Sequence, residues 1–190
     1  MKSLIKPLVF ISSLAFFACN SNSTSSGSDA TSAKTDSTKT DSSTALNPVS
    51  SKSEQDFINY AVPANTKEII WLEAAIKQAH NSEVKEHAKM MLKDHKKLDE
   101  TVKNYLTYHS GISVPSVDTT NVVDIKDKKG KDWDKAWSDK MVMDHSDLLG
   151  KLKQSQSDIK DTALSSIITN TIPVVESHLA MAKTLQNKFH

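Results

Sequence analysis

Residues 84–105, VKEHAKMMLKDHKKLDETVKNY, decide the fold class because their apolar residues recur at helical spacing. Positions three and four apart lie on one face of an α-helix. The stripe on this face consists of Val84, Ala88, Met91, His95, Leu98, Val102 and Tyr105. The stretch therefore predicts an amphipathic helix whose buried face is interrupted in its middle by His95.

Three more stretches have the same spacing, one before and two after this helix. The first stripe consists of Phe57, Ala61, Ala64, Glu68, Leu72, Ala75 and Ala79. The third consists of Trp137, Met141, His145, Leu148 or Leu149, and Leu152. The fourth consists of Leu164, Ile167, Thr171, Val174, His178, Met181 and Leu185. Four amphipathic helices predict an all-α protein with a four-helix bundle.

Two of the connections predict how the first three helices are joined. Ser82 before Glu83 is a plausible helix cap, so a tight turn near residues 80–82 joins the first two helices. Gly111 and Pro115 end the second helix. Residues 110–132, about 23 residues, have no helical stripe and exceed a simple hairpin loop. They are long enough to run the length of the bundle as a crossover.

The fourth helix completes the topology. Asp161 is its expected N-cap, and Pro173 is expected to kink it near residues 169–171. A long connection between helices two and three, with short connections elsewhere, predicts the topology of a ferritin-like, up-down-down-up bundle.

The N-terminal 53 residues indicate the cellular location of the protein and are not expected to be part of the folded domain. Residues 1–18 combine Lys2 and Lys6 with a short apolar run, which is typical of a secretory signal peptide. The run ends at Cys19, the only cysteine, in a pattern that resembles a bacterial lipobox. The alternative is a plain signal peptide with an incidental cysteine. Residues 19–53 read as a lipidated cysteine and a disordered tether rich in Ser and Thr, and residues 54–190 as the bundle domain.

These features predict a lipoprotein of the bacterial cell envelope. A multiply acylated Cys19 would anchor the protein stably to a membrane. Because Asn20, and not Asp, follows the cysteine, we expect the outer membrane, with the domain facing the periplasm.

Composition and motifs exclude several function classes. All 24 basic residues are lysines, which argues against a nucleic-acid partner because nucleic-acid recognition relies heavily on arginine. Phosphate-binding glycine loops and a GxSxG nucleophile motif are absent from the sequence. An enzymatic metal site would need an open coordination position and a cleft, and the sequence indicates neither. The sequence offers no candidate catalytic residue, and it does not identify a protein partner.

One polar residue interrupts each of the four stripes: Glu68, His95, His145 and His178. Counted from the first turn, and with a crossover placing the third helix at that end, each lies about 10–13 residues along its helix. At 1.5 Å per residue these depths agree to within about one helical turn. Counting from the last hairpin leaves a mismatch of roughly 7 Å. A layer of one Glu and three His would suit Zn²⁺, Fe²⁺ or Cu²⁺.

A methionine lies one helical turn from each of the three histidines. Met91, Met141 and Met181 each lie one turn from a histidine on its own face, and the crossover places all three on the same side of the layer. A soft second layer of thioethers would favour Cu⁺. Methionine at helical spacing is also ordinary core filler.

The alternative to a metal site is a purely structural or partner-binding envelope module. A buried Glu and three His could instead form a closed polar network that fixes the register of the bundle without metal. Ligands that converge would favour the metal site, whereas ligands that point apart or bond to one another would favour the network.

The chain resembles domain-of-unknown-function family 4142, envelope proteins of ferritin-like fold. The resemblance is carried by DFINYAVPANTKEIIWLEAAIKQAHNSEVKEHAKMMLKDHKKL at residues 56–98, WSDKMVMDHSDLL at 137–149 and IPVVESHLAMAKTL at 172–185. Its most specific elements are Asp94-His95, Asp144-His145 and Pro173 before His178.

The resemblance implies the fold and the envelope location, but no established activity. The family's recurrent polar positions fall on Glu68, His95, His145 and His178. Di-iron ferritins carry Glu-x-x-His on two helices. Here the residues three before the histidines are Leu92, Val142 and Val175, so ferroxidase activity is not expected.

Overall fold

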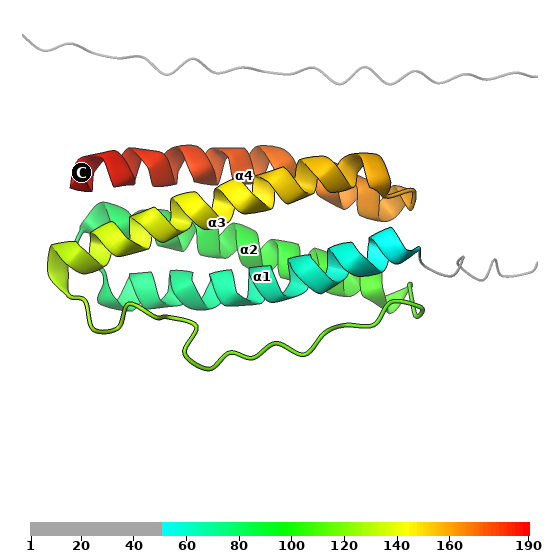
Figure 1. Cartoon of the computed structure of the whole chain (residues 1–190), viewed down its shortest axis with the longest axis horizontal. Coiled ribbons are helices and arrows are strands. Elements are labelled where there is room, and N and C mark those ends of the chain that lie inside the picture. The colour runs from blue at the N-terminus through cyan, green and yellow to red at the C-terminus, as the bar shows by residue number, and fades with distance from the viewer. Residues whose placement is uncertain (1–50) are drawn as a thin grey trace, which may run out of the picture. The chain divides into compact units, whose positions relative to one another are not determined.

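The computed structural model describes residues 51–190, which fold into helices and contain no strand. The four helices are α1 (Lys52–Gln78), α2 (Ser82–Thr107), α3 (Gly130–Asp158) and α4 (Thr162–Phe189) (Figure 1). This confirms the all-α four-helix bundle. The predicted signal peptide, Cys19 and most of the tether lie outside the described residues.

The four helices run up, down, down and up (Figure 1). α1 and α2 form one antiparallel pair, α3 and α4 form another, and residues 108–129 run back along the bundle between α2 and α3. The start of α3 meets the α1–α2 turn through Asp134, whose carboxylate accepts hydrogen bonds from the backbone N–H of His80 at 2.9 Å and of Asn81 at 2.7 Å. A buried carboxylate thus satisfies the amides of the turn and fixes α3 beside it.

The helix ends correct two expectations. α1 begins at Lys52, before the expected boundary at 54, because Ser51 and Glu54 form a capping box. The cap of α2 is Asn81 and not Ser82: the Asn81 side chain accepts a hydrogen bond from the N–H of Glu83. Asp161 caps α4 as expected, accepting from the N–H of Leu164.

Two helices contain an internal proline, and α4 buries a different set of residues from the expected one. α1 continues through Pro63, and α4 continues through Pro173. On α4 the buried valine is Val175, 2% exposed, whereas the expected Val174 is 38% exposed. The 14 residues from Leu164 to His178 can be divided into steps of three and four in more than one order. Packing against the neighbouring helices selects the order that buries Ile168 and Val175.

Two hydrophobic clusters fill the bundle. The tryptophan cluster lies toward the α1–α2 turn and includes Trp71, Trp133, Trp137, Met91 and Met141. Val122 and Val123 of the crossover pack against it. The isoleucine cluster lies toward the other end and includes Phe57, Ile58, Ile112, Ile159, Leu164 and Ile168. Between the clusters, each helix contributes polar residues to a buried layer.

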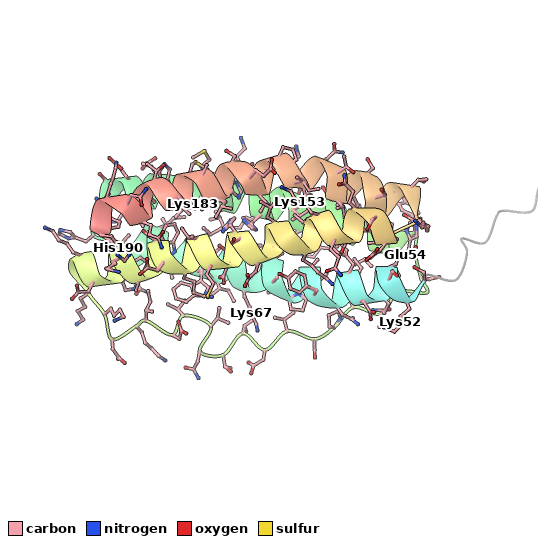
Figure 2. All side chains as sticks on the ribbon, turned by 45° about the horizontal axis from the view of Figure 1, so that its top comes forward. Lys52, Glu54, Lys67, Lys153, Lys183 and His190 are labelled. Atoms are coloured by element: carbon pink, nitrogen blue, oxygen red, sulfur yellow. The ribbon has the colours of Figure 1, made fainter. Side chains whose placement is uncertain are left out.

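The outside of the bundle is strongly charged. Figure 2 shows the exposed residues Lys153 and Lys183 on the outer surface. Among residues 51–190, no helix is both long and apolar enough to cross a membrane.

Candidate metal centre

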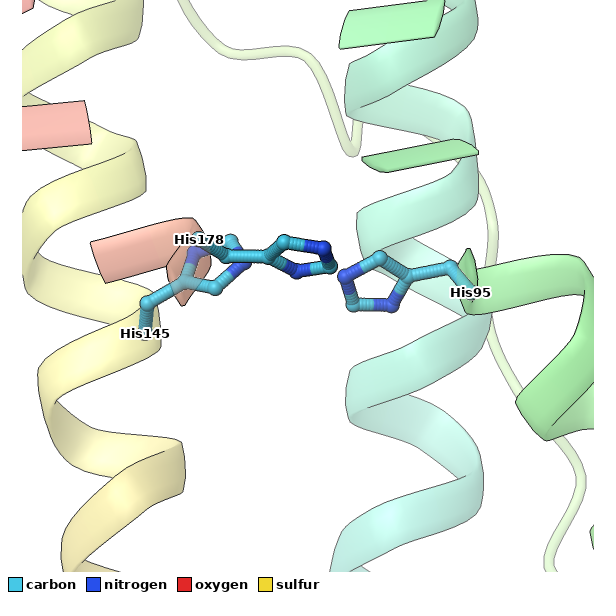
Figure 3. Close-up of side chains that lie close together, drawn as sticks. All are labelled: His95, His145 and His178. Carbon is cyan, nitrogen blue, oxygen red and sulfur yellow. The ribbon is translucent and has the colours of Figure 1, made fainter. Parts of the chain in front are cut away.

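Three helices each place one histidine in the polar layer between the two clusters. His95 comes from α2, His145 from α3 and His178 from α4, and all are buried, at 3%, 1% and 2% exposure. Each histidine is buried because it belongs to an apolar helical stripe, and a residue in register with apolar neighbours is buried together with them. In Figure 3 the ring of His95 faces the rings of His145 and His178 from the opposite side.

The three rings are close enough to share one ion. Their centroids are 5.4–5.7 Å apart, and each ring offers a nitrogen within 4.8 Å of the nitrogens of the other two. Nitrogens bound at about 2.1 Å to one tetrahedral ion lie about 3.4 Å apart. The nitrogens would therefore need to approach one another by no more than about 1.4 Å.

The outer nitrogen of each ring is held by a partner that fixes the tautomer. Asn65 donates its amide N–H to the carbonyl of His95 at 3.2 Å, which leaves Oδ1 of Asn65 to accept from Nδ1–H of His95 at 2.8 Å. Nδ1–H of His145 donates to the carbonyl of Met141 at 2.9 Å. Nε2–H of His178 donates to the carboxylate of Asp94 at 3.1 Å. Such partners orient metal-binding histidines and raise their basicity.

These assignments leave a lone pair on each inner nitrogen. Nε2 of His95, Nε2 of His145 and Nδ1 of His178 are buried and have no hydrogen-bond partner among the described residues. Three acceptors cannot bond to one another, so the neutral rings cannot close a network by themselves. A buried polar atom without a partner costs about 1–3 kcal/mol, and a metal ion would satisfy all three.

Burial keeps the rings neutral, as metal binding requires. Loss of solvation, assisted by the neighbouring histidines, lowers the pKa of His95 to about 3 and that of His145 to about 4. Burial also lowers the pKa of His178, although Asp94 acts in the opposite direction. Protons therefore do not compete for the three lone pairs at neutral pH.

Glu68 lies beside the histidines but is not one of the three converging groups. Its Oε1 is 4.0 Å from Nδ1 of His145, too long for a hydrogen bond, and has no partner among the described residues. Burial, assisted by the charge of Asp144, raises the pKa of Glu68 to about 8. As a neutral acid, Glu68 could offer the three lone pairs at most one donor.

The predicted methionines lie on the tryptophan-cluster side of the histidines. Met91 and Met141 are 0% exposed, and Met181 packs against the same cluster. These positions are those of core residues, and a soft second layer of thioethers remains a prediction.

Two pockets reach the centre from different sides of the bundle. One, of about 460 Å³, lies between α1, α3 and the crossover, and Glu68, His95 and His145 line it. The other, of about 500 Å³, lies between α2 and α4 and is lined by His95 and His178. The cleft that the sequence did not indicate is therefore present beside the histidines.

Sequence reasoning missed the outer partners of the rings. Asn65 lies three residues before Glu68, which places it near the same face of α1, and this spacing could have suggested it. Asp94 is next to His95 in sequence yet bonds to His178, 84 residues away. Nothing in local spacing indicates that pairing, because it depends on how α2 and α4 pack.

Comparison with protein families gives one match. The model of a family described as "Domain of unknown function (DUF4142)" matches residues 37–185, and the chain belongs to this family. The comparisons with curated proteins and with solved structures gave no match.

Proposed function

We propose that this member of the DUF4142 family is a lipid-anchored protein of the bacterial cell envelope whose helical bundle binds one transition-metal ion. One observation carries the metal site: three buried histidines, each with its outer nitrogen engaged, turn unpaired nitrogens toward one another. His95, His145 and His178 would supply the three ligands. Glu68 would be a fourth ligand or would face a bound water.

The donor set narrows the choice of metal. Neutral imidazole nitrogens suit Zn²⁺, Fe²⁺ and Cu²⁺, whereas a contribution from Met91, Met141 or Met181 would favour Cu⁺. Three histidines with a free fourth position also occur in catalytic zinc sites. Metal handling without catalysis is the function that requires only the residues described above.

The proposed location rests on the sequence of residues 1–20. The signal peptide and Cys19 support a lipid anchor, and Asn20 supports the outer membrane with the bundle facing the periplasm. Cell fractionation tests this. The wild-type chain should appear in the outer-membrane fraction, and Cys19→Ser should appear in the soluble periplasmic fraction. An unchanged distribution would reject the anchor.

Metal content is the test of the site. The full chain, purified in detergent without a histidine tag, would be offered Zn²⁺, Fe²⁺, Cu²⁺ and Cu⁺ separately, and its metal measured after gel filtration. We expect about one ion per chain for the preferred metal. His95→Ala and His178→Ala should lose it. His87→Ala, which removes a half-buried histidine of α2 outside the centre, should retain it.

The same measurement distinguishes the metal site from a purely structural role of the polar layer. No metal above background in the wild type, with His95→Ala and His178→Ala changed only in stability, would leave the four polar residues as a structural layer. The protein would then be an anchored structural or partner-binding module.

A further inference from the structure

We propose that a divalent cation reaches the three histidines through one side of the bundle, the acidic pocket between α1, α3 and the crossover. This inference rests on the metal centre proposed above. It adds a route of entry, and it gives the crossover a role in forming the wall of that route.

The packing of the bundle leaves two seams where an ion could enter. Most contacts between helices join α1 to α2 and α3 to α4. The two remaining seams, α1–α3 and α2–α4, contain the pockets of about 460 Å³ and 500 Å³. His95 lines both pockets, so the histidine layer separates them. Entry by either seam is possible in principle, and charge decides between them.

The α1–α3 pocket ends on unpaired ligand atoms. Glu68, His95 and His145 line it and are at most 7% exposed. Oε1 of Glu68 and Nε2 of both histidines have no partner among the described residues. An ion that entered this pocket would meet two of the three histidine ligands and the carboxyl group of Glu68.

The walls of this pocket carry negative charge. Four aspartates line it, two from the crossover and two from α3: Asp118, Asp124, Asp144 and Asp147. Lys67 and Lys140 are its cationic residues, and Lys140 is held by both oxygens of Asp144. Leaving Glu68 out of the count, the four aspartates and two lysines give the walls a net charge of −2. A cleft of one sign concentrates ions of the opposite sign and accelerates their association.

The α2–α4 pocket offers a cation no such attraction. Its charged residues are Asp94 and Lys97, which sum to zero, and Asp94 is already bonded to His178. The apolar residues Leu98, Ile167 and Val175 form part of its wall. A hydrated divalent ion would lose solvation there without compensating charge.

The experiment measures association kinetics with the full chain in detergent, using Cu²⁺ alone as the probe. Nitrogen sites generally bind Cu²⁺ most tightly among the divalent first-row metals. Binding would be followed by quenching of tryptophan emission, since Trp71 also lines the pocket. The test variant is Asp124→Asn with Asp147→Asn. Both residues are exposed, so their replacement should leave the core intact.

A matched control and a converse variant accompany it. Asp56→Asn with Asp158→Asn removes the same charge from exposed positions outside the lining of both pockets. Asp56 is 12 residues from Glu68 along α1, about 18 Å, where salt at 0.1 M screens most of its effect. Asn170→Lys places a positive charge in the α2–α4 pocket.

We expect the association rate of the test variant at about 0.1 M salt to fall roughly three- to sixfold, with an unchanged dissociation rate. The difference should shrink as salt rises, and the control pair and Asn170→Lys should match the wild type. Equal rates in the test variant, or slowing by Asn170→Lys alone, would overturn the route while leaving the metal centre intact. Failure of the wild type to bind Cu²⁺ or any other ion offered would overturn both.

Discussion

The tryptophan cluster and the histidine layer are neighbours on the same helices, and they differ in what they bury. Met91 and Met141 are 0% exposed, and one turn further along α2 and α3, His95 and His145 are 3% and 1% exposed. The methionines and tryptophans bury apolar surface, which stabilises the fold. The histidines bury nitrogen atoms that have no partner among the described residues. Equal burial thus contributes to folding in one region and opposes it in the other.

This difference separates residues that hold the bundle together from those that would hold an ion. Apolar side chains of similar size could fill the histidine layer with a gain in stability. The polar layer is instead positioned by outer partners, which a packing role alone does not require. Substitutions in the tryptophan cluster should therefore lower the stability of the fold, whereas apolar substitutions in the histidine layer should raise it and remove the ion.

The largest effect is expected from Trp137→Ala in the tryptophan cluster. Trp137 is 0% exposed, and removing its indole should lower the free energy of unfolding by about 3–5 kcal/mol. Urea unfolding followed by circular dichroism would measure the loss. The folded fraction should still bind one ion. Loss of metal from chains that remain folded would contradict the separation between cluster and layer.

The next effect concerns an outer partner of the histidines. Asp94→Ala removes the acceptor of His178 Nε2–H and should weaken metal binding by about 10- to 100-fold. Asp94→Asn keeps an acceptor oxygen and should recover most of the affinity. Asp99→Ala, which removes a surface partner of Lys103 on the same helix, is the control. Competition titration against a chelator would give the affinities. Equal affinity in Asp94→Ala and Asp99→Ala would show that Asp94 does not position the ring.

A smaller effect of opposite sign is expected from His145→Leu. This removes an unpaired buried nitrogen and leaves no orphan behind, since the carbonyl of Met141 keeps its bond within the helix. The metal-free protein should become more stable by about 1–2 kcal/mol while losing its metal. Thermal unfolding in the presence of a chelator would test this. A clear loss of stability would mean that His145 serves the fold.

The smallest effect is a difference in pH dependence between the same two proteins. Burial lowers the pKa of His145 to about 4 from its usual 6.5. Between these two pKa values the unfolded chain binds a proton at His145 that the folded state does not bind. The titration of His145 therefore leaves the free energy of unfolding unchanged above pH 6.5 and lowers it as the pH falls toward 4. Between pH 6 and pH 5 the wild type should lose about 1 kcal/mol more than His145→Leu.

Glu68 does not disturb that difference, because both proteins retain it. Its pKa, raised to about 8, makes the folded state bind a proton that the unfolded chain releases above about 4.5. The stability that Glu68 contributes is therefore present below pH 4.5 and declines as the pH rises to 8. Parallel pH profiles for wild type and His145→Leu would contradict the lowered pKa of His145.

Much of the fold was accessible from the sequence because helical periodicity is a local property. The stripes placed four helices, and a rise of 1.5 Å per residue brought Glu68, His95, His145 and His178 to one level. Where two orders of three- and four-residue steps were available, as between Leu164 and His178, periodicity could not choose. Packing against the other helices placed Val175 and not Val174 in the core.

The sequence by itself determined that there are four amphipathic helices and that the polar residue in the stripe of each lies at one level of the bundle. Only the tertiary structure decided what the atoms of these polar residues do. Asn65 and Asp94 fix the tautomers of His95 and His178 across 30 and 84 residues of sequence, and a crossover segment closes an acidic pocket over two of the rings. The physical reason is that spacing along a helix fixes a direction from its axis, whereas a hydrogen bond between helices depends on their separation and rotation. Those are set by the packing of the whole bundle.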